Sequence, residues 1–357
     1  MVNYYQPFLL PFLGLKRHLT PTHVKRYYYH SWEDALWELL RKKQIPLGST
    51  ILFPNFYCMD VLENVAKHGY KWQLYELDKN FQSTPQILVE AIHQHEPRIV
   101  ILFHACGITT NLLKQTDWIK SIPPETIIIE DCVHRLTNPK EVELLNDNHF
   151  VMDSLRKDSP LPGSFIYGTH KGLNYKQSNQ DFSTYQISST MLFILFRLTF
   201  LLSQLLNSGK LSNFAHHTLL KAHDDIIGDS WKSYPGLPWI PFIHSFINFE
   251  KIEKLKTEQA KLYTELLKEL FTPDSQFYKI NIPESDYGKL HVYPLGLKHN
   301  RPEKLIEYLN KHNLNIWTKF PDCPWSEDKS VLFLPLGFHI HKKDIVRIMR
   351  LIKSYDK

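Results

Sequence analysis

Two apolar segments that alternate with helical patterns constrain the fold most strongly. Residues 98–105 (RIVILFHA) and 126–131 (TIIIED) are apolar at nearly every position, and helical spacing precedes them over 85–95 and near 112–121. Strands that are apolar on both faces form parallel sheets with helices on each side. The sequence therefore predicts an α/β fold with a mostly parallel sheet flanked by helices.

The same alternation extends towards the N-terminus. Ser31 can cap a first helix, and Gly69 can end a second one. The expected elements in this part are helices over 32–43 and 58–68 and strands over 49–54 and 71–77.

The pattern changes after about residue 240. A long amphipathic helix is predicted there, followed by a mixture of short strands and helices. We therefore expect a large α/β domain over 1–240 and a smaller α+β domain over 241–357. The predicted elements are helices over 246–271, 301–313 and 341–355 and strands over 289–297 and 330–336.

Composition narrows the function. The net charge is +5, but Lys and Arg are scattered and form no basic stripe with aromatic residues, which argues against nucleic-acid binding. The four cysteines form no CxxC pair, so we expect free thiols and no metal site. The apolar stretch at 8–13 is short and has basic residues after it, unlike a secretory signal. A cytoplasmic protein is expected.

The longest apolar run is 191–206 (MLFILFRLTFLLSQLL). Arg197, Ser203 and Gln204 interrupt it, and it is shorter than the roughly 20 residues that span a bilayer. We expect a buried or dimer-facing helix here. The alternative is membrane contact through a helix that lies in the interface of the bilayer.

Polar residues follow several of the predicted strands, including Asn55, His104 and Asp131. In parallel sheets, ligands bind at the carboxyl ends of the strands, so these residues mark a candidate site. Lys157 follows in a predicted loop, and the neighbouring Arg156 would lower its pKa, as an amine that forms a Schiff base requires. A capping role for Asp131 and a surface position for Lys157 are the alternatives.

Several segments together resemble one family. VMDSLRKDSPLPGS resembles the SLRK-type Schiff-base loop of the DegT/StrS family of pyridoxal-phosphate (PLP) aminotransferases, and IIIEDCVH is similar to its aspartate strand. The resemblance continues in STILFPNFYCMDVLENVAKHGYKWQLYELD, RIVILFHACG and KSVLFLPLGFHIHKKDIVRIM, and it covers about 25–175 and 245–355. It implies the PLP-transferase fold type I.

The resemblance also implies site residues around the cofactor ring. Lys157 would hold PLP as the internal aldimine, and Asp131 would pair with the pyridinium N–H. His134 matches a residue that lies near the cofactor. Tyr57 or Cys58 falls where the family covers one face of the ring.

A second group would hold the cofactor phosphate. Ser154 would donate a hydrogen bond to it, and Ser31 and Trp32 would offer backbone N–H groups from the start of a helix. Two positions depart from the family pattern: Trp32 stands where the family has glycine, and Ser164 replaces the second glycine of a pair.

By resemblance, the chain is expected to be a homodimeric aminotransferase that acts on small molecules. The amino acceptor would be a nucleotide-linked keto-sugar in polysaccharide or secondary-metabolite biosynthesis. Two alternatives stay open: a PLP-dependent dehydratase or lyase of the same fold, and a catalytically inactive scaffold, which the departure at Trp32 would fit.

Overall fold

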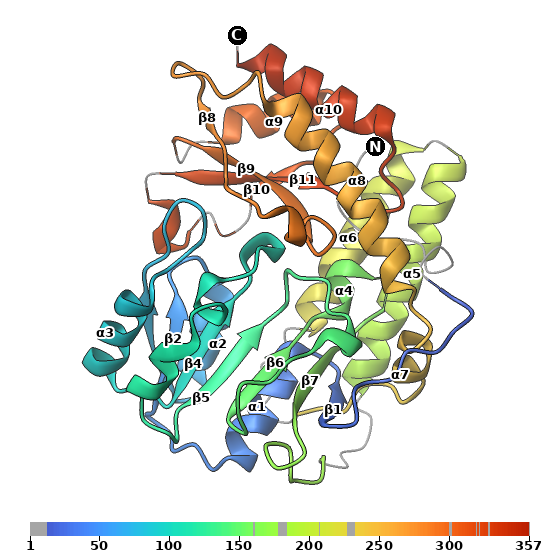
Figure 1. The fold of residues 1–357 in the computed structure, drawn as a ribbon. Coiled ribbons are helices and arrows are strands. Elements are labelled where there is room, and N and C mark those ends of the chain that lie inside the picture. The colour runs from blue at the N-terminus through green and yellow to red at the C-terminus, as the bar shows by residue number, and fades with distance from the viewer. Residues whose placement is uncertain are drawn as a thin grey trace.

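The computed structural model describes residues 13–159, 161–177, 184–206, 208–226, 233–299, 302–318, 320, 322–327 and 329–356. Within them, the main sheet has seven strands in the order β1-β7-β6-β5-β4-β2-β3 (Figure 1). Strands β2 to β6 run parallel, and β7 is antiparallel to its neighbours β6 and β1. The strands are β1 (Val24–Tyr29), β2 (Thr50–Pro54), β3 (Lys71–Tyr75), β4 (Ile99–Phe103), β5 (Ile127–Asp131), β6 (His149–Met152) and β7 (Ser164–Thr169). The predicted α/β class is confirmed.

Three helices connect the parallel strands: α1 (Trp32–Lys42), α2 (Met59–Lys67) and α3 (Pro85–His95). Capping residues mark the starts of α1 and α3, and a glycine follows α2. Ser31 caps α1 through its side chain, and Thr84 caps α3, which has Pro85 in its first turn. Gly69, with φ +81°, follows α2. The central strand β4 is buried along its whole length, as its unbroken apolar sequence predicts.

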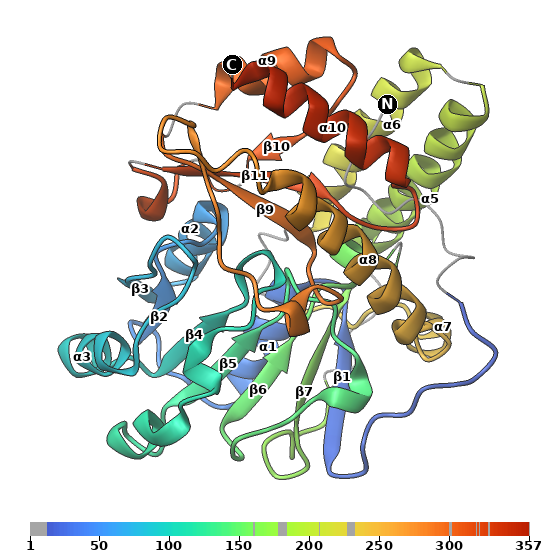
Figure 2. The same cartoon turned by 45° about the horizontal axis from the view of Figure 1, so that its top comes forward.

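A second, antiparallel sheet lies in the C-terminal part, with strands in the order β10-β11-β9-β8. It sits above the carboxyl ends of the main strands (Figures 1 and 2). The loops after β2 and β5 touch it: the Trp325 N–H donates to the Asn55 carbonyl, and Arg135 forms a bridge with Leu290. The elements are α7 (Trp239–His244), α8 (Phe249–Leu267), β8 (Phe277–Tyr278), β9 (Val292–Leu297), α9 (Glu303–Lys311), β10 (Trp317–Thr318), β11 (Ser330–Pro335) and α10 (Lys342–Tyr355). The domain boundary at residue 240 stays a prediction.

Two helices form a hairpin on one side of the molecule: α5 (Thr184–Leu205) and α6 (Gly209–Ile226) (Figures 1 and 2). Their shared core holds Phe193, Phe196 and Phe200 against Ala215 and Leu219. Among the residues that the structure describes, none of the helices combines the length and the apolar character that crossing a bilayer requires.

Within the main sheet and its connections, the structure differs from the sequence-based expectations in two places. The helix expected near 112–121 is a pair of 3₁₀ turns, Asn111–Leu113 and Thr116–Ser121. Strands β1 and β7 were not predicted, because their pairing joins segments about 140 residues apart. Most of the apolar stretch at 8–13 lies outside the described residues.

Candidate active site

The end of β5 delivers two consecutive carboxyl groups to opposite faces of the sheet. Successive side chains of a strand point to opposite sides, so Glu130 and Asp131 enter different surroundings. Asp131 faces Tyr57, in the turn after β2, whereas Glu130 faces His104, which follows β4. The candidate active site lies on the Asp131 face.

Asp131 is almost completely buried, with 1% of its surface exposed. Its Oδ2 accepts a hydrogen bond of 2.5 Å from the Tyr57 hydroxyl, and its Oδ1 accepts one of 2.9 Å from the Val133 N–H. Burial raises the pKa of Asp131 to about 7, because these two bonds and the charge of Lys157 offset the cost of desolvation only in part. The carboxyl group therefore titrates near neutral pH.

Lys157 lies on the short helix α4 (Leu155–Asp158), not in the loop that was expected. The chain returns over this helix, and the Gly163 carbonyl accepts from the Leu155 N–H at 2.9 Å. Gly163 has φ +92°, and a Cβ there would lie 2.2 Å from the Tyr28 hydroxyl oxygen, so the return requires glycine. Half-buried on α4, Lys157 is close enough for its charge to lower the pKa of both Asp131 and Glu33.

A buried ion pair anchors α4. Lys256 of α8 is fully buried, and its Nζ lies 2.7 Å from Asp158 Oδ1 and 2.7 Å from the Leu290 carbonyl oxygen. His291 Nδ1 lies 3.5 Å from the same carboxylate. Burial would raise the pKa of Asp158, but the charges and hydrogen bonds of Lys256 and His291 together outweigh burial and lower it. The residue next to Lys157 is thus fastened to the C-terminal part of the chain.

The start of α1 brings further acidic groups to the site. Ser31 Oγ accepts from the Asp34 N–H at 3.0 Å and donates to Asp34 Oδ2 at 2.8 Å, and the Tyr234 N–H donates to Asp34 Oδ1. Glu33 is 5% exposed, and burial raises its pKa even though Arg156 and Lys157 lower it. Two buried carboxyl groups therefore lie where the sequence predicted an anion site.

The other residues predicted for the site lie around the pair formed by Asp131 and Tyr57, and their contacts differ. His134 is buried among aromatic rings, stacked on Phe320 at 5.6 Å between centroids, and it contacts Phe103, which in turn packs against Tyr57. The Cys58 thiol lies 3.8 Å from Asp60 Oδ2, so Tyr57 is the member of this pair that reaches Asp131. Trp32 is buried beside Ser31, and Ser154 begins α4 without a capping bond from its side chain.

Sequence reasoning missed Glu33. Its position at the start of a predicted helix gave no reason to expect burial. Acidic residues there commonly face solvent, where they interact favourably with the helix dipole. The available signal was the pair of acidic residues, Glu33 and Asp34, directly after the expected capping serine.

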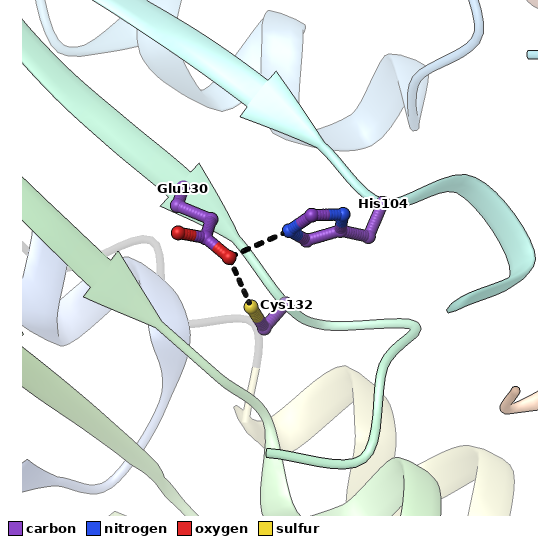
Figure 3. Close-up of side chains that lie close together, drawn as sticks. All are labelled: His104, Glu130 and Cys132. Atoms are coloured by element: carbon purple, nitrogen blue, oxygen red, sulfur yellow. Dashed lines mark hydrogen bonds and ion pairs between the residues drawn. The ribbon is translucent and has the colours of Figure 1, made fainter. Parts of the chain in front are cut away.

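On the opposite face of the sheet, His104, Glu130 and Cys132 lie together (Figure 3). His104 Nε2 is 2.7 Å from Glu130 Oε1, and the Cys132 sulfur is 3.6 Å from the same oxygen. His149 Nε2 lies 3.5 Å from Glu130 Oε2. Glu130, Cys132 and His149 line a cavity of about 270 Å³.

These distances would suit a metal ion, but the hydrogen bonds of the two rings do not. The Thr110 N–H donates to His104 Nδ1 at 3.2 Å, and the Leu145 N–H donates to His149 Nδ1 at 3.0 Å. A neutral ring that accepts at Nδ1 in this way carries its proton on Nε2 and offers no lone pair there. The cluster is best explained as a buried carboxylate that is hydrogen-bonded to His104 Nε2, with His149 Nε2 lying 3.5 Å away.

This cluster predicts a pH dependence of stability. Burial would raise the pKa of Glu130, but the hydrogen bond from His104 and the positive charges around the carboxylate together outweigh burial and lower it to about 2. A lowered pKa in the folded state contributes stability above the unfolded value, and that contribution is lost as the pH falls towards 2. The free energy of unfolding, measured with urea, should therefore fall between about pH 5 and about pH 3 by about 2 kcal/mol more in the wild type than in Glu130→Gln.

Glu143→Gln is the matched control, because Glu143 is exposed and lines the same cavity. It should follow the wild type at both pH values. Parallel pH profiles for the wild type and Glu130→Gln would contradict the assignment of Glu130 as a buried, charged group.

Comparison with known proteins supports the fold. No protein-family model matches the sequence, and no curated protein matches it. Among solved structures, Spr1654 from Streptococcus pneumoniae (apo form) has a TM-score of 0.60 at 11% identity over 93% of this chain and 86% of that chain. DesV from S. venezuelae, in complex with a ketimine intermediate, has a TM-score of 0.58 at 13% identity over 93% and 85%.

A DegT DnrJ EryC1 StrS aminotransferase from Brucella abortus has a TM-score of 0.54 at 16% identity, over 94% of this chain and 86% of that chain. Because these sequence identities are low, the comparison shows a shared fold. The chain therefore has the fold type I architecture of these aminotransferases over nearly its whole length, as the sequence resemblance implied.

Proposed function

We propose that the chain is a PLP-dependent aminotransferase. The observation that carries this proposal is that the buried Asp131 ends β5 at the carboxyl edge of the sheet, while Lys157, on α4 directly after the neighbouring β6, lowers the pKa of Asp131 through its charge. A cofactor with an aldehyde and a pyridine nitrogen needs an amine for the first and a carboxylate for the second. The shared fold of solved aminotransferases supports the same assignment.

The residues at the ring end fit PLP. Asp131 has a pKa of about 7 because it is buried, and a pyridinium N–H beside it would favour the ionised carboxylate. Tyr57 already donates to the same carboxylate, which places its aromatic side chain next to the predicted position of the ring. Lys157 offers the amine.

The residues at the phosphate end fit less closely. Ser154 has a hydroxyl that makes no capping bond, and Arg156 provides a positive charge near the start of α1. Glu33 lies beside the same arginine and lysine, so a phosphate would meet a carboxyl group there. Burial raises the pKa of Glu33, although the charges of Arg156 and Lys157 lower it.

When bound, PLP supplies an electron sink that allows an amino group to leave one substrate and enter another. The chain would contribute three actions. Lys157 Nζ would bind the cofactor and then, once an amino donor has displaced it, carry the proton from the amino-bearing carbon of the substrate to the cofactor. Asp131 would hold the pyridinium nitrogen protonated. The C-terminal part, which lies over the carboxyl edge of the sheet, would limit the access of water (Figure 2).

For the substrate, we propose a keto-sugar carried on a nucleotide, in polysaccharide or secondary-metabolite biosynthesis. The fold shared with Spr1654, whose name describes a sugar aminotransferase, supports a sugar. The nucleotide, the pathway, a cytoplasmic location and a homodimer follow from the sequence resemblance and from composition.

The test uses the purified full chain. PLP should give visible absorbance, and reduction with borohydride should attach the pyridoxyl group to Lys157, as peptide mass spectrometry would locate it. An amino donor should then convert the cofactor to its amine form. Elimination without that conversion would favour the lyase, and labelling of another lysine, or no binding of PLP, would refute the proposal.

Glu33 gives a second prediction. Glu33→Gln should increase the affinity for PLP about tenfold, because it removes a carboxyl group next to the phosphate. Pyridoxal, which lacks the phosphate, is the matched ligand, and its affinity should change little. The measurement is a titration followed by absorbance. An equal gain for both ligands would mean that Glu33 does not act on the phosphate.

A further inference from the structure

The cavity of about 270 Å³ beside Glu130 lies on the face of the sheet opposite the candidate active site. Residues 99–152 are all described, and their connections between β4, β5 and β6 contain 3₁₀ turns but no α-helix. Parallel strands are usually joined through an α-helix that packs on the sheet. Here short turns take its place, and the cavity remains between them and the strands.

The cavity has room for a small organic molecule. Its volume is nearly twice the roughly 150 Å³ of an engineered cavity that binds benzene. Exposed residues, Lys114 and Glu143 among them, line one part of it and mark its opening to solvent. Glu130 and His149 line another part, with side chains that are 16% and 1% exposed. A ligand that enters would therefore meet the Glu130 carboxylate at the inner end.

One oxygen of the Glu130 carboxylate has unused capacity to accept hydrogen bonds. Oε1 lies 2.7 Å from His104 Nε2 and 3.6 Å from the Cys132 sulfur, and Figure 3 shows both interactions reaching this same oxygen. Among the described residues, Oε2 has only His149 Nε2 beside it, at 3.5 Å, which is longer than an ordinary hydrogen bond. Oε2 can therefore accept a donor from a molecule in the cavity.

The cations near Glu130 already have carboxylate partners. Arg135 Nη1 lies 3.1 Å from Asp286 Oδ1, and Lys289 Nζ lies 2.5 Å from Glu141 Oε2. Glu130 has imidazole rings beside it instead, and its pKa of about 2 keeps it ionised. Its negative charge therefore favours a positively charged ligand in this cavity.

Apolar side chains form much of the cavity wall. They are Leu113, Leu136, Val142, Leu145 and Val151. None of the described residues that line it is phenylalanine, tyrosine or tryptophan, so it lacks the aromatic cage that binds quaternary ammonium groups. A sugar would place several hydroxyl groups against these walls without partners. An ammonium group on an aliphatic chain suits both the carboxylate and the walls.

We propose that this cavity binds a small aliphatic primary amine. Its ammonium group would donate to Glu130 Oε2, and its hydrocarbon chain would lie between the leucine and valine side chains. This inference does not depend on the proposed reaction, because the cavity and the candidate active site lie on opposite faces of the sheet.

The first experiment titrates the full chain with n-hexylamine and, separately, with 1-hexanol, and follows binding by calorimetry. The two molecules have the same chain, but the alcohol carries no charge. The amine should bind with a dissociation constant of about 1 mM or lower. The alcohol should bind at least about tenfold more weakly, because a charged donor makes the stronger bond with a carboxylate.

Glu130→Gln removes the charge and keeps the shape of the side chain. It should weaken the binding of hexylamine at least about tenfold and change the binding of hexanol less than about threefold. Glu143→Gln is the matched control, because Glu143 is exposed and lines the same cavity. Lys157→Ala should bind the amine as the wild type does, which separates this site from any reaction of the amine at the candidate active site.

A second variant tests the cavity without removing charge. Leu145 is 38% exposed and lines the cavity, so Leu145→Trp should obstruct it and weaken the binding of hexylamine at least about fivefold. Leu47→Trp is its control, because Leu47 is 68% exposed and does not line the cavity. Circular dichroism would verify that each variant is folded.

Three results would overturn the proposal. The first is the absence of hexylamine binding at millimolar concentration. The second is equal affinity for the amine and the alcohol, which would mean that the cavity selects for apolar surface alone. The third is an affinity for the amine that Glu130→Gln leaves unchanged or that Lys157→Ala abolishes, since either would place the amine elsewhere.

A photochemical experiment locates the ligand directly. An aliphatic primary amine that carries a diazirine on its chain is bound to the full chain and irradiated, and the labelled peptides are identified by mass spectrometry. The label should appear in the part of the chain over 136–151, and excess hexylamine should prevent it. Labelling confined to other segments, or labelling that hexylamine does not reduce, would contradict the assignment of this cavity.

Discussion

Replacement of Lys157 by alanine is expected to abolish transamination. The rate should fall by about 10⁴-fold or more, because the variant loses both the amine that binds PLP and the group that carries the proton. Borohydride should then attach no pyridoxyl group to residue 157. The measurements are the rate of cofactor conversion by an amino donor and the mass of the labelled peptide.

Lys171→Ala is the matched control, since Lys171 has a side chain that is 82% exposed and pairs with Asp147 on the surface. It should keep full activity. Added methylamine should restore part of the activity of Lys157→Ala, because a small amine can replace the missing proton carrier. No rescue, or activity of the variant within tenfold of the wild type, would argue against Lys157 as the catalytic lysine.

The second large effect is expected at Lys256. Lys256→Met should lower the free energy of unfolding by about 3–5 kcal/mol, because it leaves the Asp158 carboxylate buried without its cation. Urea unfolding at neutral pH measures this. Lys261→Met, an exposed lysine on the same helix, should cost less than about 1 kcal/mol.

The ion pair also allows a stricter test. Asp158→Asn combined with Lys256→Met should be more stable than Lys256→Met alone, because the buried charge is gone from both partners. If the two single lysine variants unfold at the same urea concentration, α4 does not depend on this ion pair. Because Lys157 is next to Asp158, we also expect Lys256→Met to weaken the binding of PLP.

Hydrophobic periodicity predicted the parallel core of the fold. The segments 98–105 and 126–131 could be assigned as central strands because a strand covered on both faces needs apolar residues at every position. Helix 85–95 was predicted with its bounds, since Thr84 and Pro85 mark its start by local chemistry. Local signals of this kind are sufficient where neighbours in the sequence determine the structure.

The features that were missed depend on distant contacts. Helix α4 is one turn long and is completed by the carbonyl of Gly163, which arrives after a loop. The burial of Glu33 depends on the packing of other segments around the start of α1. Strand β1 pairs with β7, which lies far along the chain. None of these leaves a periodic pattern in the sequence.

The residues of the candidate site divide in the same way, into those with a local signal in the sequence and those without one. Asp131 could be placed because parallel strands end at a common edge, and Lys157 because its surroundings resemble a known motif. The carboxylate cluster around Glu130 escaped detection, although its residues lie on three adjacent strands: His104 follows β4, Glu130 is near the end of β5, and His149 begins β6. The strand order, which shows that they are neighbours, follows from the assembled sheet.

Because Glu130 and Asp131 face opposite sides of the sheet, the two faces differ in how their charge depends on pH. The two groups are adjacent in the chain, yet the pKa of one is about 2 and that of the other about 7, because the backbone sends them into unlike environments. One face of the sheet thus keeps a permanent negative charge, while the other can take up or release a proton under ordinary cellular conditions. The backbone of the sheet separates the two carboxyl groups, so the charge on each face changes with pH independently of the other.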